Sequence, residues 1–476
     1  MPAAEGNTLQ ETRLRENPEG AGNRASQPRF SPDNVGWLIL VSALFFAAQM
    51  LPALLRLPLG TDEITYIART SLHQSGVMLP PVHGHAAGLL AAPVTLFTTS
   101  LLALRIWMAL LSAVGLLLSL LCWRGLRPTW VLALGGFIFA SLAITQLSGV
   151  QVYPDLWAAY AALAITGLLL QAVEQRMRLQ VALPLIAFLA FFIVLLRPQN
   201  IVFVLAPTFA APLVVRGWRQ PRILVAMLLG TALGLLEWAA EAYLWFGGLF
   251  HRIHLARQEP PTFAPHFSPV MQAKVLSGPW YCQDNHICPD WNFPLFILWW
   301  IALIGLVVLG LYAVWHTTAK ASAVLAVVTG LWSAVLYIVF VPFGAPRYML
   351  PTWALFAMVA ADGIVWLATV PKWRRIGAAA ACGFLLIGVI TQHLVIIRET
   401  AHETTIRAFA SKARILRNDG IRPPCVIFSP AVAYYVGCSA PWTGATIDQI
   451  LNRNGGVKQW HEIHPPGPIQ SVWVRG

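Results

Sequence analysis

Charged residues are scarce in this chain of 476 residues, of which only 11% are Asp, Glu, Lys or Arg. A soluble globular domain has about a quarter of its residues charged, so this scarcity excludes an ordinary soluble protein. Hydrophobic residues make up 57% of the chain, and they recur in long apolar runs. About 20 apolar residues cross the hydrocarbon core as a helix. In lipid, the backbone N–H and C=O groups must be hydrogen-bonded within the protein, which favours helices. The sequence therefore predicts an all-α polytopic membrane protein.

An apolar signal segment is also lacking, since no hydrophobic core precedes Phe30. Residues 1–34 are polar and of mixed charge, and they are expected to form a disordered cytoplasmic tail. The net charge of +12 would indicate nucleic-acid binding in a soluble protein. In a membrane protein we attribute it to basic residues in cytoplasmic loops.

Eleven apolar segments are predicted to span the membrane. They lie near residues 35–56, 104–123, 130–148, 155–173, 181–196, 200–215, 222–246, 293–315, 321–342, 348–370 and 376–397. The apolar stretch 86–104 contains Pro93 and directly abuts the next span. We interpret it as a helix on the membrane surface, with a twelfth span as the alternative.

Basic residues fix the expected orientation through the positive-inside rule. With the N-terminus in the cytoplasm, every short inner loop is basic: Arg124 and Arg127; Arg176 and Arg178; Arg216, Arg219 and Arg222; Lys320; Lys372, Arg374 and Arg375. Residues 57–103 and 247–292 become outer loops of a transmembrane domain over 35–397. An odd number of spans places residues 398–476 outside the cytoplasm. There the stretch CVIFSPAVAYYVGC alternates apolar residues and predicts a small extracytoplasmic α/β segment.

Cysteine is rare, with six residues in the chain, and four of them fall on the predicted outer side. Disulfides form in oxidising compartments. We therefore expect Cys282 to pair with Cys288 and Cys425 with Cys438, with free thiols as the alternative because spacing alone does not establish geometry.

Polar residues that interrupt the apolar pattern gather on the predicted outer face. They are Asp62 and Glu63 in LPLGTDEITYIART, Asp155 in SGVQVYPDLW, Arg197 and Gln199 in LLRPQNIV, His251, Arg252 and His254 in FGGLFHRIH, and Arg347 and Tyr348 in FGAPRYMLP. Charges at membrane depth are costly and tend to mark substrate paths. Carboxylates can accept a proton, and a guanidinium grips phosphate through a planar fork. The set suits transfer from a phosphorylated lipid, in which a carboxylate deprotonates an acceptor hydroxyl and arginine stabilises the departing phosphate.

Structural roles compete with this interpretation. Asp62 is a favoured helix N-cap residue, and Asp155 follows Pro154 where acids favour the helix dipole. Arg197 and Arg347 could snorkel to lipid headgroups. His83 and His85 have a metal-ligand spacing, but no further ligand cluster is evident in the sequence. No metal site is therefore predicted, while a divalent cation stays open as a cofactor.

The order of these motifs resembles the GT-C superfamily of integral-membrane glycosyltransferases, especially the branch with protein O-mannosyltransferases and the lipid A aminoarabinose transferase. The likeness rests on TDE at residues 61–63, MLPPVHGH, LLALRIWMALLSAVGLLLSLL, Asp155 and RYMLP at residues 347–351, and covers roughly residues 35–400. The element HGHAAG departs from the usual pattern and leaves the donor sugar open.

The resemblance implies an undecaprenyl- or dolichyl-phosphate-linked sugar donor and inverting transfer on the outer face, in a bacterial inner or plasma membrane. It implies Asp62 as general base beside Glu63, with Asp155 as a third candidate. Arg347, and also Arg197 and Tyr348, would bind the lipid phosphate. His83, His85 and His251 are expected to line the substrate site. The acceptor, a glycan, lipid or protein, stays undetermined, and no nucleic acid is expected.

Two other activities compete with glycosyl transfer. A transporter or flippase for a lipid-linked glycan would also have many spans and cationic sites, but transporters often show internal repeats, and no half-to-half repeat is evident. A glycan ligase or polymerase would differ only in using a lipid pyrophosphate donor. A further alternative is an assembly partner without activity.

Overall fold

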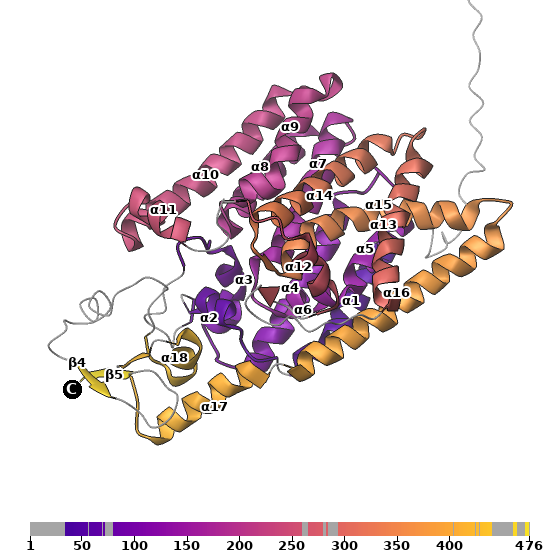
Figure 1. Ribbon diagram of the computed structural model, residues 1–476. Coiled ribbons are helices and arrows are strands. Elements are labelled where there is room, and N and C mark those ends of the chain that lie inside the picture. The colour runs from indigo at the N-terminus through magenta and orange to yellow at the C-terminus, as the bar shows by residue number, and fades with distance from the viewer. Residues whose placement is uncertain are drawn as a thin grey trace, which may run out of the picture.

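A computed structural model gives the architecture of the protein (Figure 1). It describes residues 34–55, 57–68, 70–71, 80–258, 265–278, 282–283, 294–402, 404–423, 425–427, 429–439, 460–463 and 472–475. The predicted N-terminal tail and most of the loop around Cys288 lie outside these ranges.

Nine helices of the described chain are long and apolar enough to cross a membrane, and a bent pair of shorter helices raises the number to ten if it counts as one span. The long helices are α1 (Gly36–Leu54), α4 (Leu101–Leu121), α7 (Pro154–Val173), α8 (Leu179–Leu196), α10 (Pro221–Trp245), α13 (Pro294–Val314), α14 (Lys320–Phe340), α15 (Leu350–Thr369) and α16 (Arg374–His402). The protein is therefore an integral, all-α membrane protein, as the composition predicts.

Shorter elements connect these helices. They are α2 (Thr61–Ile67), α3 (Ala86–Thr95), α5 (Thr129–Ser141), α6 (Ala143–Val150), the π-helix η1 (Ile201–Leu205), α9 (Ala206–Val214), η2 (Arg216–Trp218), α11 (Leu249–Gln258), α12 (Pro269–Lys274), η3 (Val275–Ser277), η4 (Pro346–Met349), α17 (Thr404–Asn418) and α18 (Pro430–Val436). The strands are β1 (Cys282–Gln283), β2 (Phe343–Gly344), β3 (Cys425–Ile427), β4 (Trp460–Ile463) and β5 (Val472–Arg475).

The structure differs from the eleven predicted spans at two places. The segment expected over 130–148 is broken into α5 and α6, whose axes differ by 78°. Leu142 at the break is extended rather than helical, and the side-chain oxygen of Gln392 accepts a hydrogen bond from the amide of Ala143. The segment expected over 200–215 is a short helix, Ile201–Val214, that starts as a π-helix. Periodicity and hydropathy do not reveal a break that is stabilised by a distant side chain.

The apolar stretch 86–104 does not form a single long helix. Its first part is α3, which has 10 residues, and α4 starts separately after the N-cap Ser100. At 1.5 Å per residue α3 is about 15 Å long, half of what crossing the hydrocarbon core requires. A twelfth span is therefore absent from this part of the described chain.

Helices α7 and α15 are the most buried of the long helices, and α7 packs against α4, α8 and α15. Every residue of α7 is buried, and its many alanines allow this close packing on all sides. A helix that is apolar all round is expected in such a position. Asp155 lies at the start of α7, and Tyr348 lies just before α15. These two buried helices therefore position the candidate site.

The C-terminal segment forms a small unit beside α2, with α17, α18 and an antiparallel sheet in the order β3-β5-β4. In Figure 1, α18 lies next to α2, and the hydroxyl of Tyr435 accepts a hydrogen bond from the amide of Leu59 at 3.2 Å. A disulfide joins Cys425 to Cys438, which confirms that predicted pair. Cys282 also takes part in a disulfide, but its predicted partner Cys288 lies outside the described residues.

Candidate active site

Two carboxylates and two arginines meet where α2, α7, η4 and the end of α8 come together. We call this region the α2 end of the bundle. The Arg347 guanidinium donates to the Asp62 carboxylate at 2.8 Å, and its Nε lies 3.5 Å from Asp155 Oδ2. Arg197 donates to the other Asp155 oxygen at 3.0 Å. The four side chains, predicted from segments far apart in the sequence, therefore form one continuous chain of opposite charges.

The adjacent acids Asp62 and Glu63 point in different directions. Neighbouring residues on a helix are about 100° apart. Asp62 is 43% exposed and faces Arg347, whereas Glu63 is fully buried against Arg105 of α4. Both Glu63 oxygens are occupied, since they also accept hydrogen bonds from the amides of Gly60 and Val152. Asp62 thus stays accessible, while Glu63 ties the start of α2 to its neighbours.

Arg105 also binds the backbone around the start of α2. It is completely buried and also donates to the carbonyl oxygens of Leu57, Pro58 and Val150. A buried charge is tolerated when it is paired and its remaining protons are satisfied. The Glu63–Arg105 pair therefore holds α2, and with it Asp62, against the bundle.

Tyrosine rings surround the two arginines. The Arg347 guanidinium lies 4.4 Å from the centre of the Tyr153 ring, and Arg197 lies 5.1 Å from that of Tyr348. Tyr348 in turn stacks on Tyr337 with ring centres 5.4 Å apart. Guanidinium groups are attracted to aromatic faces, so these rings orient both arginines toward the carboxylates. Tyr153 and Tyr337 were not predicted, although Tyr153 stands two residues before Asp155.

Several buried polar atoms in the same place have no hydrogen-bond partner. They are the Tyr66 hydroxyl, His83 Nδ1, Asp155 Oδ2 and Arg347 Nε. Buried polar groups are normally satisfied, and unsatisfied ones together at an accessible carboxylate are typical of a site that a ligand or water completes. This group of atoms provides both donors and acceptors.

Burial and the charges of the site shift the pKa values of Asp62 and His83. Burial alone would raise the pKa of Asp62, but the positive charges of Arg347 and Arg197 outweigh it and lower the pKa below its ordinary value. Burial, together with Arg197, lowers the pKa of His83 to about 3, despite the opposite effect of Asp62. Near neutral pH Asp62 is therefore ionised and His83 is neutral. The His83 ring packs edge-on against Tyr66, with centres 5.1 Å apart.

The backbone between His83 and His85 is held tightly against α8. A side chain at Gly84 would overlap the carbonyl oxygens of Leu195 and Leu196, so glycine permits the close approach. Arg252 of α11 donates to the carbonyl oxygens of Pro81 and His83. These contacts place His83 beside Asp62 and turn His85 toward α10.

His85 belongs to a separate polar cluster on α10. Its Nε2 lies 2.5 Å from Glu241 and 3.8 Å from Glu237. The ligand atoms of the three residues lie within 4.8 Å of one another and could hold a metal ion. One imidazole and two carboxylates are donors that zinc accepts, but Arg252 also pairs with Glu241 at 2.9 Å and would compete with a cation. The two glutamates were missed because their partner His85 lies some 150 residues away in the sequence.

His251, the remaining predicted substrate ligand, is exposed on α11. It takes part in none of the described ion pairs or ring contacts of the Asp62 group. Its role in substrate binding stays a prediction.

Solved structures of other proteins share this architecture. The crystal structure of ArnT from Cupriavidus metallidurans bound to undecaprenyl phosphate superposes with a TM-score of 0.60 at 13% identity, over 88% of each chain. The apo structure of the same protein gives a TM-score of 0.53 at 13% identity, over 88% of this chain and 87% of that chain. An oligosaccharyltransferase from Archaeoglobus fulgidus gives a TM-score of 0.49 at 11% identity, over 80% of this chain and 58% of that chain.

No protein-family model and no curated protein matches the chain. At 13% identity, the likeness to ArnT establishes the fold. The fold expected from the resemblance of motifs is confirmed: this integral membrane protein has the same fold as ArnT from Cupriavidus metallidurans.

Proposed function

We propose that the protein is a glycosyltransferase that moves a sugar from a polyprenyl-phosphate donor to an acceptor on the extracytoplasmic face of the membrane. The observation that carries this proposal is the contact between the accessible Asp62 carboxylate and Arg347, in a site with unsatisfied buried polar atoms. The GT-C fold supports it, and the ArnT structure with this fold is bound to undecaprenyl phosphate.

In the proposed reaction, Asp62 accepts the proton of an acceptor hydroxyl as its oxygen attacks the anomeric carbon of the donor sugar. The bond between that carbon and the phosphate oxygen breaks with inversion, and the phosphate departs on its lipid. Arg347 and Arg197 hold the negative charge of the departing phosphate, since preorganised charges are most effective where charge develops. The proton stays on the Asp62 carboxyl group, which releases it to water after the products have left.

Binding of the donor would make Asp62 a stronger base. Arg347 pairs with Asp62 in the free protein, and this pairing lowers the basicity of the carboxylate. A donor phosphate competes for the same guanidinium, and its own negative charge opposes the effect of Arg347. The pKa of Asp62 then rises, which makes it a stronger base once the donor is bound.

Asp155 and Glu63 have supporting roles in this scheme. Asp155 is buried and contacts both arginines, so it positions the phosphate-binding pair. Glu63 has no free oxygen for a substrate proton. A divalent cation at His85, Glu237 and Glu241 would lie beside the segment that carries His83, but the scheme does not require it.

The proposal is tested by supplying the purified protein with synthetic polyprenyl-phosphate sugars and measuring the release of polyprenyl phosphate. A parallel set of polyprenyl-pyrophosphate glycans distinguishes a ligase. Release from a monophosphate donor in the presence of acceptor is expected. Movement of intact donor across a bilayer without any release would instead identify a transporter and refute the proposal.

Replacing Arg347 with lysine should lower transfer activity while the protein still folds. Lysine keeps the positive charge but loses the planar fork that binds phosphate through two parallel hydrogen bonds. We expect a loss of about tenfold or more, since one charge-assisted hydrogen bond is worth roughly 1.5–3 kcal/mol. Kinetics at varied donor concentration measures the effect. The exposed Arg219, replaced in the same way, provides the control, and equal activity of both variants would contradict the role.

Reporter fusions test the proposed orientation. A fusion after Gly420 should report an extracytoplasmic position and one after Trp373 a cytoplasmic one, because the positive-inside rule governs short loops. A cytoplasmic reporter at Gly420 would place the Asp62 site on the wrong side of the membrane for this proposal.

A further inference from the structure

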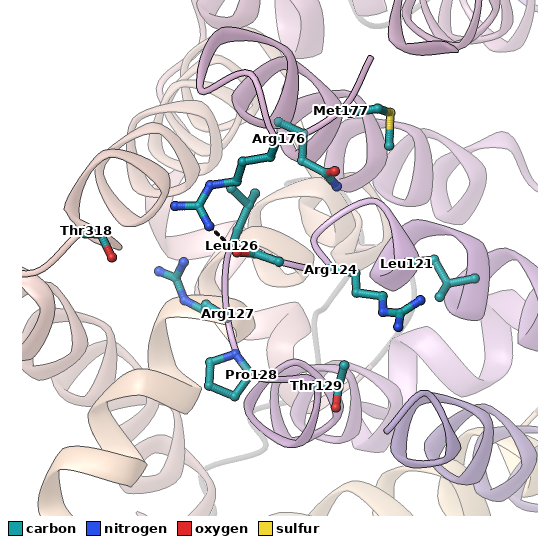
Figure 2. A pocket seen from close by; sticks show the side chains of 11 residues that line it. Leu121, Arg124, Leu126, Arg127, Pro128, Thr129, Arg176, Met177 and Thr318 are labelled. Atoms are coloured by element: carbon teal, nitrogen blue, oxygen red, sulfur yellow. Dashed lines mark hydrogen bonds between the residues drawn. The ribbon is translucent and has the colours of Figure 1, made fainter. Parts of the chain in front are cut away.

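A pocket of about 770 Å³ lies at the end of the bundle opposite to Asp62. Helix α4 links the two regions, with Arg105 near its start and Arg124 just beyond its end. A helix of 21 residues is about 30 Å long, so the pocket is distinct from the candidate active site. Three arginines line it, at positions 124, 127 and 176, together with apolar side chains that include Leu121, Leu126 and Met177 (Figure 2).

Two of the three arginines that line the pocket are held by ion pairs and hydrogen bonds within the protein. Arg127 is buried and paired with Asp362 of α15 at 2.8 Å, and it also donates to Ser322 of α14. Arg176 pairs with Glu174 at 2.6 Å and donates to the carbonyl oxygen of Gly125, the dashed contact in Figure 2. The loop after α7 is thereby tied to the loop after α4.

Arg124 differs from the other two because its charge is not neutralised. Its side chain is exposed, and it has no ion pair or side-chain hydrogen bond within the part of the chain that the structure describes. The two acids beside the pocket are already used by the other arginines. The pocket therefore has an excess positive charge and one guanidinium that is available to a ligand.

We propose that this pocket binds a phosphate-bearing ligand, with the headgroup phosphate of an anionic membrane lipid as its source. The available Arg124 fork suits phosphate oxygens, and Arg176 lies across the pocket from it. The apolar lining suits the glycerol and the first acyl carbons of a lipid. Basic pockets at the ends of membrane helices are known to take such headgroups. Inorganic phosphate has the same charged group without the apolar part, so the two sources can be separated.

The test uses the purified full-length protein in detergent and native mass spectrometry. Phosphatidic acid, phosphatidylcholine and sodium phosphate are added in separate arms. The wild type is compared with Arg124→Gln, and with Arg219→Gln as a matched control. Arg219 is also an exposed arginine, in the connection before α10, but it does not line the pocket. Thermal unfolding without added lipid verifies that each variant is folded.

The wild type and Arg219→Gln should retain phosphatidic acid but not phosphatidylcholine. Arg124→Gln should weaken this retention by about tenfold or more, as expected when a charge-assisted hydrogen bond is lost. If sodium phosphate binds in a way that depends on Arg124 and phosphatidic acid does not bind, the pocket is a phosphate site whose ligand is soluble rather than a lipid. Equal retention by Arg124→Gln and Arg219→Gln, whether high or low, would overturn the proposal, because the attraction would then come from the general cationic surface.

Discussion

Replacing Asp62 with asparagine should reduce the turnover of sugar transfer by about 100-fold or more, the usual cost of losing a general base. Asparagine has nearly the shape of aspartate, but it cannot accept the proton. Asp62 is 43% exposed on the α2 end of the bundle, so the change leaves the packing intact. Turnover at saturating donor and acceptor is the measurement, and an unchanged unfolding temperature shows that only chemistry was affected.

The neighbouring acid serves as the comparison for this experiment. Glu63→Gln should affect stability more than chemistry, because Glu63 is buried against Arg105. If Glu63→Gln abolished transfer in a folded protein while Asp62→Asn did not, the two roles would be reversed. If neither variant lost activity, Asp155 would become the leading candidate for the base.

The acid limb of the pH profile offers a further check on Asp62. Its pKa in the free protein is lowered by Arg347, so the carboxylate takes up a proton only below the ordinary range near 4. The pH dependence of kcat/KM reports groups of the free enzyme. We therefore expect no loss assignable to Asp62 until the pH falls below about 4.

Replacing Arg105 with leucine should destabilise the protein by about 3–5 kcal/mol, the cost of leaving a buried charge without its partner. Arg105 is fully buried, and it satisfies Glu63 and three backbone carbonyl groups at once. Its loss also releases the start of α2, so transfer activity should fall in the fraction that still folds. Denaturant unfolding in detergent measures the stability.

A double-mutant cycle separates the ion pair from the other contacts of Arg105. Glu63→Gln combined with Arg105→Leu should recover part of the loss, because no unpaired charge is then buried. Leucine at the exposed Arg178 is the control, with an expected effect within about 0.5 kcal/mol. A loss at Arg105 no greater than that at Arg178 would show that the buried pair does not hold α2 in place.

Sequence patterns alone predicted more of the helices than of the contacts. Apolar runs located the long helices because hydrophobic length follows directly from composition. The 78° break between α5 and α6 was missed because Gln392, more than 240 residues away, provides its hydrogen bond. The segment predicted over 200–215 is the short helix Ile201–Val214, whose π-helical start hydropathy does not show.

The sequence by itself determined that this is a helical membrane protein and that its unusual polar residues gather at one end of the helices. It also indicated the Cys425–Cys438 disulfide, now present in the structure. Only the tertiary structure decided that Asp62 contacts Arg347 while Glu63 contacts Arg105, and that His85 meets Glu241 on α10. The physical reason is that hydropathy fixes the depth of a residue along a helix, whereas its partner depends on the rotation of that helix and on which distant helix packs beside it.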